Sequence, residues 1–560
     1  MSRQPPDTLP FTFAQPFIYM KRLITAAGVL LFVLAVQGQS LPGSLHGSFQ
    51  TDAQYLFPDS IIGANAVGEK ILSNSFLQLT YQQGPISGGL RYEAYLNPLL
   101  GFDPRYEGQG IPYRFVSYTS SKLDITVGNF YDQFGNGIVF RAYQEWALGI
   151  DNSVDGIHLR LRPVRGLVVK GLLGKQRRFW ERSESLLRGA DAELTLNDLV
   201  PAWRDKQTRL SLGGSVMNRF QEDTDVRLQL PENVSAFAGR ARLDAGGFSF
   251  QSEYAYKIND PFQLNRYVYN PGSALFLSAA YTRKGLGITV SGKRIDNFDF
   301  RSERVVSLQE LSLSFLPAIS RLHTYRLPTL YPYATQLNGE VGIQGSLLYT
   351  IPRKTTLGGP YGTQVQVNFS RIHGLDTTFV EPGFRYQASY LGDWDKVYFQ
   401  DFNVEINRRW TKNFRTILTY IDLTYNKDII EFGSPTAGYG IVRVQAGVLE
   451  TQYKIKPRVS LRNEFQFMYT RQDLGSWVMA LAELSFSPHW YITVFDEFNY
   501  GNPDPARRVH YYNATVAYAF DAHRIQFGYS RQRRGLLCVG GICREVPASN
   551  GFGLTLTSSF

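Results

Sequence analysis

The chain has 560 residues, including 34 Tyr, 38 Phe and 51 Gly, and its mean hydropathy is −0.21. This hydropathy excludes a polytopic helical membrane protein, which needs repeated apolar runs of about twenty residues. The formal charge of +10 comes from singly scattered basic residues, which argues against a nucleic-acid-binding stripe. Two cysteines are too few for a disulfide scaffold.

The N-terminal segment predicts export. Residues 1–19 carry no recognisable pattern, and we interpret them as an extension upstream of a true start at Met20. Residues 20–38 have the form of a signal peptide, because Lys21 and Arg22 precede an apolar run that ends before Gly38. An uncleaved signal anchor is the alternative, although the run is short for a membrane span. The mature protein, residues 39–560, is then a single domain.

From about residue 45 onward, apolar and polar residues alternate. Ile157, Leu159 and Leu161 alternate with His158, Arg160 and Arg162, and the same pattern recurs in segments 364–370, 401–407, 459–467 and 525–530. Period-two alternation predicts strands with one apolar and one polar face. A soluble sheet of this length would divide into domains joined by linkers, and the sequence shows no such linkers.

The connections between these strands alternate between short and long. Short turns are predicted at 84–85, 120–122, 163–166, 245–247, 284–285, 409–412, 456–458, 487–489 and 521–523. Longer polar loops are predicted at 57–73, 97–112, 177–187, 219–233, 258–272, 372–395, 426–441 and 532–549. This alternation is typical of an up-and-down barrel with short periplasmic turns and long outer loops. Aromatics near strand ends, such as Tyr453, Tyr469, Trp477, Trp490 and Tyr512, are expected to form its interfacial girdles.

The fold class is therefore all-β. We predict a large antiparallel transmembrane β-barrel with about 26 strands, in a range of roughly 22 to 26, at about ten residues per strand. This count requires a short strand near residues 321–325.

The segment 128–156 is the densest irregular stretch between two predicted strands. It mixes glycines and aromatics with Asp132, Arg141, Glu145, Asp151 and Asp155. We interpret it as a loop folded into the lumen, with these charges facing water; a structured surface loop is the alternative. On the strands, the charged residues predicted to face the lumen are Arg160, Arg162, Asp401, Glu405, Arg462 and Glu464. These residues either set the charge selectivity of the lumen or are only the water-facing side of the strands.

Two features mark the C-terminal end. Cys538 and Cys543 flank Gly540 and Gly541, which suits a small disulfide ring, whereas a metal site would need more ligands. The final strand is expected to close the barrel against a strand near residues 46–56. It also resembles the C-terminal insertion signal of outer-membrane barrels, carried by Phe552, Leu554, Leu556 and Phe560.

Several segments resemble a family of uncharacterised outer-membrane barrels found in Bacteroidetes. These segments are 128–156, 293–297, 323–325, 331–335 and 538–549, of which the Cys-x-Gly-Gly-x-Cys-Arg loop is the most specific. The family is a domain of unknown function, so the resemblance implies fold and location but no substrate and no catalytic residues.

The function indicated by the sequence is a porin-like channel for small polar solutes in the bacterial cell outer membrane. The alternative is a non-transporting scaffold or partner subunit in outer-membrane assembly, secretion or surface-protein attachment. The sequence carries none of the hydrolase, zinc-protease or phosphate-loop motifs, so we expect neither an enzyme nor a cofactor or metal. Expected partners are outer-membrane lipid, the barrel insertion machinery and other outer-membrane subunits, with no nucleic acid.

Overall fold

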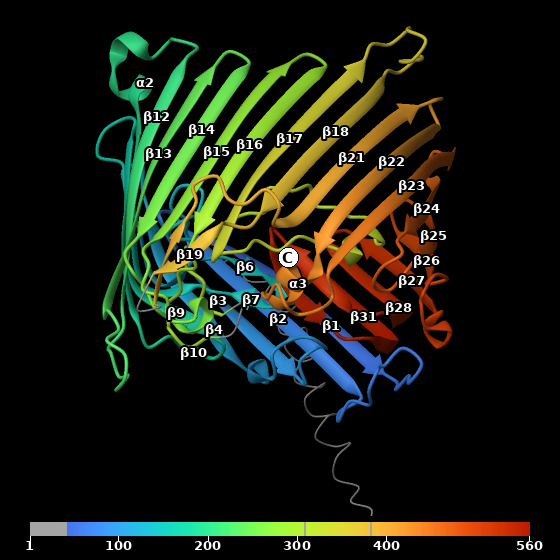
Figure 1. Ribbon diagram of the computed structural model, residues 1–560, viewed down its shortest axis with the longest axis horizontal. Coiled ribbons are helices and arrows are strands. Elements are labelled where there is room, and N and C mark those ends of the chain that lie inside the picture. The colour runs from blue at the N-terminus through green and yellow to red at the C-terminus, as the bar shows by residue number, and fades with distance from the viewer. Residues whose placement is uncertain (1–41, 307–309, 381–383) are drawn as a thin grey trace, which may run out of the picture.

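The computed structural model describes residues 42–306, 310–380 and 384–560. Within these ranges, 24 antiparallel strands form one closed barrel (Figure 1). The predicted fold class is thus confirmed, and the strand number lies within the expected range. The proposed N-terminal extension (1–19) and signal peptide (20–38) lie outside the described residues.

The barrel strands follow chain order around the wall. The first twelve are β1 (Ser44–Leu56), β2 (Ile71–Gln83), β3 (Ile86–Leu96), β4 (Gly108–Thr119), β5 (Leu123–Phe130), β8 (Val154–Leu161), β9 (Leu167–Arg178), β11 (Leu186–Thr195), β12 (Arg209–Phe220), β13 (Asn233–Ala245), β14 (Phe248–Lys257) and β15 (Gly272–Arg283). The other twelve are β16 (Leu286–Asp296), β17 (Gly339–Ile351), β18 (Thr363–His373), β21 (Val397–Arg409), β22 (Phe414–Asn426), β23 (Ile441–Lys456), β24 (Val459–Tyr469), β25 (Trp477–Phe486), β26 (Trp490–Phe498), β27 (His510–Phe520), β28 (His523–Gln532) and β31 (Ser549–Ser559).

The last strand closes the barrel on the first. β31 pairs with β1 from Ser48↔Ser559 to Leu56↔Gly551, and Figure 1 shows the two strands side by side. This is the partner that the sequence predicted for the terminal strand. A closed ring leaves no strand edge unpaired, as a barrel in lipid requires.

Side chains alternate across the wall as the sequence pattern predicts. On β21, Phe402 and Ile406 are exposed on the outer face, whereas Asp401 is fully buried on the inner face. Exposed aromatic and branched side chains cover the outer face of the other strands too, for example Phe465 and Phe467 on β24. An apolar outer face and a polar inner face are the pattern of a barrel surrounded by lipid.

The connections alternate between a short-turn end and a long-loop end. At the short-turn end, two connections are longer than expected: one contains the helix α2 (Leu196–Leu199), and the other spans residues 352–362. None of the described helices is long and apolar enough to cross a membrane. Trp477 was expected in an aromatic girdle, but this is wrong. Its side chain points inward and is buried beside Tyr511, so it belongs to the interior.

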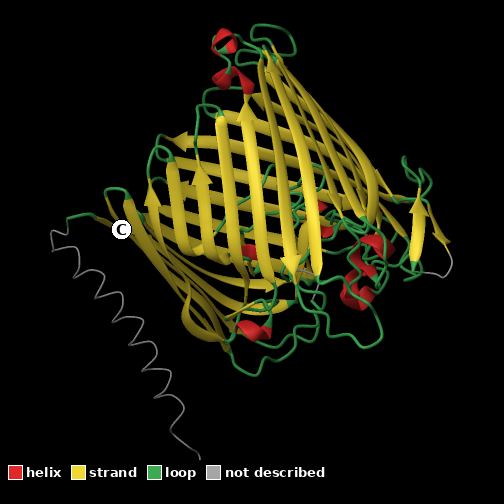
Figure 2. Ribbon diagram, turned by 90° about the vertical axis from the view of Figure 1, so that its left-hand side faces the viewer, coloured by secondary structure: helices red, strands yellow, loops and turns green. Residues whose placement is uncertain are grey.

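Within the described residues, three long connections fold into the barrel: 131–153, 297–338 and 533–548. We call them together the plug. Figure 2 shows these loops gathered between the strands toward one end of the barrel. They pack against the inner wall in two apolar clusters, one around Phe134 and Phe300 and one around Tyr331 and Tyr425.

The short strand expected near residues 321–325 is absent. The described part of 297–338 contains a single turn of helix, η5 (Pro328–Leu330), and otherwise runs as irregular chain inside the barrel. β16 pairs directly with β17, so the alternation of strand directions needs no strand between them. The barrel therefore has 24 strands where about 26 were predicted at about ten residues per strand, and the absent strand is one source of this difference.

Candidate functional site

The first plug segment, 131–153, turns back on itself inside the barrel. Gly135 and Gly137 have positive φ angles of 53° and 92°, and Gly137 N donates to the Phe134 carbonyl at 2.8 Å. This turn places Phe134 and Phe140 against the wall with no exposed surface. β5 extends to Phe130 and β8 begins at Val154, so the segment is shorter than the predicted 128–156.

Asp132 ties this segment to the wall. Its carboxylate lies 2.9 Å from Nε2 of His158 on β8 and accepts a hydrogen bond from Lys170 Nζ on β9 at 2.7 Å. Burial would raise the pKa of Asp132, but the hydrogen bonds from His158 and Lys170 outweigh it and hold the pKa below its usual value. Asp132 therefore holds the first plug segment to β8 and β9.

Asp151 occupies the centre of a buried charge network. Arg177 Nη1 lies 2.7 Å from its carboxylate, Arg91 also pairs with it, and the Tyr131 hydroxyl donates to it at 3.0 Å. The same arginines bind Glu93 on β3, so two cations face two carboxylates. Burial would raise the pKa of Asp151, but Arg177 and Arg91 outweigh it and lower the pKa. Removing one member would leave an unpaired charge in the interior.

The other three charges predicted for the lumen loop differ in their surroundings. Arg141 is half-buried with its guanidinium 3.9 Å from the Phe315 ring centre, and burial lowers its pKa. Glu145 accepts a hydrogen bond from Ala147 N at 3.2 Å and caps a short helical turn. Asp155 lies on β8, outside the plug, and pairs with Arg182 at 2.8 Å. The expectation that all five charges face open water in the lumen is therefore wrong for the buried Asp151 and for Asp155.

The second plug segment, 297–338, contacts the inner wall at β21 and β26 through charged side chains. His323 Nε2 lies 2.9 Å from the Asp401 carboxylate, and Arg321 pairs with Glu405 two residues further along β21. Arg326 pairs with Glu497 on β26. Asp401 and Glu405 thus lie on the inner wall and hold a chain segment there.

The remaining residues predicted to face the lumen also lie on the inner wall. Arg162 pairs with Asp124 at 2.7 Å, and Arg160 shares its face of β8. Arg462 bridges Glu450, at 2.9 Å, and Glu464. The Arg162 and Asp124 side chains keep partial exposure, so water reaches this part of the lumen.

The third segment, 533–548, is a hairpin of β29 (Gly535–Val539) and β30 (Ile542–Val546), joined by the Cys538–Cys543 disulfide. It lies against the other two segments. The Gly541 carbonyl accepts a hydrogen bond from Thr335 N at 3.1 Å, and Arg544 donates to the Ala147 carbonyl at 3.0 Å. All three segments therefore form one body.

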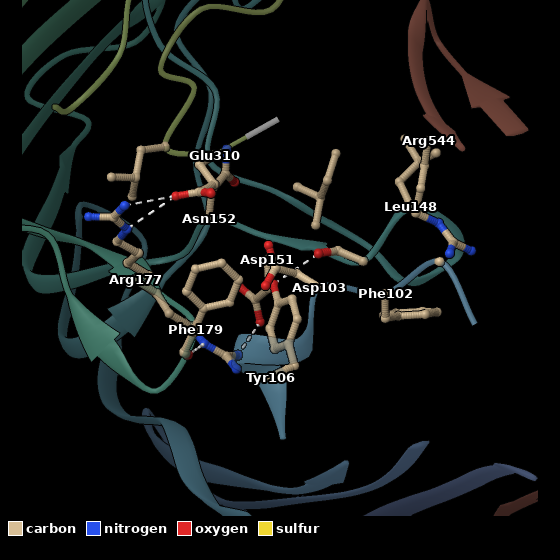
Figure 3. A pocket seen from close by; sticks show the side chains of 15 residues that line it. Phe102, Asp103, Tyr106, Leu148, Asp151, Asn152, Arg177, Phe179, Glu310 and Arg544 are labelled. Carbon is tan, nitrogen blue, oxygen red and sulfur yellow. Dashed lines mark hydrogen bonds and ion pairs between the residues drawn. The ribbon is translucent and has the colours of Figure 1, made fainter. Parts of the chain in front are cut away.

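A cavity of about 370 Å³ lies between the plug, the end of β9 and the connection from β3 to β4. Figure 3 shows the Arg544 guanidinium against the Phe102 ring at one end, 4.5 Å from the ring centre. At the other end, the rings of Tyr106 and Phe179 meet with centres 4.8 Å apart. Cations and aromatic faces in one cavity can hold a small polar molecule that also has a flat or apolar part. The described residues contain no group of three or more His, Cys, Asp or Glu placed to hold a metal ion.

A family model matches residues 20–560, and its description is "Family of unknown function (DUF6029)". The chain belongs to this family. A comparison of this DUF6029 protein with curated proteins finds no match.

Solved structures similar to the DUF6029 chain include three outer-membrane proteins, all at low identity. The siderophore receptor PirA from Pseudomonas aeruginosa is 11% identical, with a TM-score of 0.41 over 93% of this chain and 81% of that one. The P pilus usher PapC translocation pore is 9% identical, with a TM-score of 0.41 over 92% and 99%. The outer membrane protein opdK from Pseudomonas aeruginosa is 10% identical, with a TM-score of 0.33 over 76% and 97%.

Sequence reasoning missed one plug segment and two wall residues that hold the plug in this DUF6029 protein. A strand was predicted near residues 321–325, whereas 297–338 forms no barrel strand; Phe298 and Phe300 alternate with polar residues as strand residues do, so the local pattern gave no warning. The arginines of the buried network, Arg91 and Arg177, gave no signal, because each sits in an ordinary alternating strand. Their role depends on a carboxylate 60 or 26 residues away in sequence.

Proposed function

We propose that this protein is an outer-membrane channel for small polar solutes whose lumen is closed by its own plug. Charged residues on the inner wall, outside the plug, support the proposal of a channel. Arg162, Asp124 and Arg462 line the inner face and keep partial exposure, so water reaches the lumen wall at these positions. A polar, water-filled interior is the form that porin-like barrels take.

The proposed location is the bacterial outer membrane, reached through the predicted cleaved signal peptide and the barrel insertion machinery. The support is the apolar outer face of a closed antiparallel barrel, which would be unstable in water.

The plug is proposed to move as a gate. It contacts the wall through ion pairs on opposite sides, such as Asp132 with Lys170 and Arg321 with Glu405. Ionic groups can exchange a protein partner for water at low net cost where water reaches them, so these contacts can open without unfolding the barrel.

Conductance across a planar lipid bilayer tests this function. We expect small or rare current steps for the purified protein, and larger steady steps for a variant in which a short Gly-Ser linker replaces residues 132–152. Heat-modifiable migration on a gel would show that both barrels are folded. A folded variant that passes no current would refute the channel.

The second candidate is a non-transporting scaffold or partner subunit. One observation favours it: Phe134, Phe140, Phe298 and Phe300 are completely buried between plug and wall, which makes the closed state costly to leave. Absence of current from both proteins, together with subunits that co-purify in stoichiometric amounts, would select this candidate.

A further inference from the structure

The connection between β18 and β21 lies on the outside of the barrel. We call its described residues, 374–380 and 384–396, the strap. It includes the hairpin of β19 (Thr377–Val380) and β20 (Arg385–Ala388), which stands outside the wall on the right of Figure 2. The strap differs from the plug in this respect, although both come from the long-loop end of the barrel.

Contacts with outward-facing side chains of three neighbouring strands fix this position. Arg294 of β16 donates to the carbonyls of Ser389 and Tyr390 at 3.2 and 3.0 Å. Gly392 packs so closely on Val341 of β17 that a Cβ at Gly392 would lie 2.4 Å from the valine side chain. Lys293, next to Arg294, is buried on the inner side, which places Arg294 on the outer side.

Both ends of the strap also contact the barrel. Toward β18, the Trp394 ring lies 4.4 Å from the His373 ring. Toward β15, the Tyr386 hydroxyl donates to Asp296 at 2.7 Å, and Asn270 Nδ2 donates to the Tyr386 carbonyl at 2.6 Å. The strap thus crosses the outer rim and satisfies polar side chains that would otherwise face outward from the strand ends.

Several large apolar side chains of the strap are exposed. Phe379 and Tyr390 are each 68% exposed, and Leu391 is 67% exposed. Phe384, Trp394 and Val380 are also exposed. Several exposed aromatic and aliphatic side chains within one short segment mark a site of contact with another apolar phase or partner.

We propose that the strap lies in the outer-leaflet interface of the membrane and binds lipid through these side chains. The surface is continuous with the lipid-facing band of the same strands. Directly beneath the strap, the next outward-facing side chains are Val290 on β16, Ile343 on β17 and Phe369 on β18, all exposed. A segment that rests on top of this band meets the headgroup and upper acyl region, where aromatic side chains are most stable.

Spin labels on single introduced cysteines test this placement. The two native cysteines form a disulfide and the described residues contain no free thiol, so a new cysteine is labelled alone. The test position is Leu391→Cys, with Tyr390→Cys as a second. Val290→Cys reports the lipid band, and Val226→Cys, at a loop residue that is 97% exposed, reports water. All four side chains are exposed, so the substitutions leave the fold intact.

The measurement compares collision of each label with oxygen and with a water-soluble nickel chelate, in vesicles of phosphatidylethanolamine and phosphatidylglycerol. We expect the ratio of oxygen collisions to chelate collisions to be several-fold higher for labels at positions 390 and 391 than for the label at position 226. This ratio should approach the value for the label at position 290. Chelate access equal to that at 226 would overturn the proposal. Protection from both reagents in native outer membranes, combined with chelate access in pure lipid vesicles, would also overturn it, because the occupant would then be a protein.

Discussion

The ring of Phe560 lies directly over Gly47. The two residues also exchange both backbone hydrogen bonds, at 2.9 Å from Gly47 N to the Phe560 carbonyl and at 3.0 Å in the other direction. A Cβ on residue 47 would lie 2.1 Å from the ring, closer than atoms can approach. The terminal aromatic thus packs at the seam that joins the first and last strands.

Replacing Gly47 by valine should weaken closure of the barrel. The branched side chain cannot coexist with the Phe560 ring, so the C-terminal residue must leave the seam. We expect a lower yield of the heat-modifiable folded form in outer-membrane fractions. Gly553→Ala on β31 is the matched control, since a Cβ there meets open space. Equal yields from the two variants would show that the contact does not contribute to closure.

A carboxylate in the first long loop should make stability depend on pH. Asp59 accepts hydrogen bonds from Arg531 on β28 at 2.7 Å and from Asn550 on β31 at 3.2 Å, and thereby spans the seam. The hydrogen bond from Arg531 is the main cause of a lowered pKa at Asp59. A lowered folded-state pKa stabilises the fold above the usual Asp value, and this stabilisation is lost as the pH falls through the folded-state value.

Asp59→Asn should therefore reduce the free energy of unfolding by about 1 kcal/mol at pH 7, and by less in strong acid. Urea unfolding of both proteins at pH 7 and below pH 3 measures the difference. Asp504→Asn, at an exposed pair with Arg507, serves as the control and should change little. A deficit for Asp59→Asn that stays constant with pH would contradict this account.

Truncating the plug core should loosen the plug more than the barrel. Phe140 is completely buried between plug and wall, and Phe140→Ala should cost about 3–5 kcal/mol of packing energy. Amide hydrogen exchange should then rise across residues 131–153 while the barrel strands stay protected. The comparison is Phe432→Ala, which removes an exposed ring in an outer loop. Uniform loss of protection throughout the barrel would mean that plug and wall unfold together.

Removing the disulfide should affect only the final hairpin. The Cys538–Cys543 ring is small, so its loss through paired serine substitutions should cost about 2 kcal/mol locally. We expect faster trypsin cleavage after the exposed Arg534, read by mass spectrometry, and unchanged heat-modifiable migration. Reduction of the native protein should reproduce the result. Resistance to trypsin in both cases would show that contacts with the plug alone hold the hairpin.

The strands were predictable because alternation is a local property of the chain. The pairing of β31 with β1 followed from the requirement that a membrane barrel leaves no free edge. The plug was only half predictable. Glycines and aromatics in 128–156 indicated an inward loop, but its bonds depend on distant partners, as when Asp132 meets His158 and Lys170.

Two predictions were wrong, for different physical reasons. Trp477 begins a strand, as girdle residues do, yet its side chain points inward, because the phase of alternation decides which side a residue faces. A strand was predicted near residues 321–325 because the alternation of strand directions was expected to require one. A wide barrel offers an interior surface on which a long irregular chain can satisfy its polar groups, and nothing local distinguishes such a chain from a pair of weak strands.

The plug is assembled from three segments that lie far apart in the chain, and this separation affects folding. Arg326 binds Glu497, 171 residues later, and Arg544 binds a carbonyl 397 residues earlier. Contacts of such high sequence separation form late and slowly, and they cannot begin until most of the polypeptide is present. The plug therefore cannot be completed before the C-terminal strands are present, so wall and interior should form together, and a modest C-terminal truncation should prevent the interior from forming.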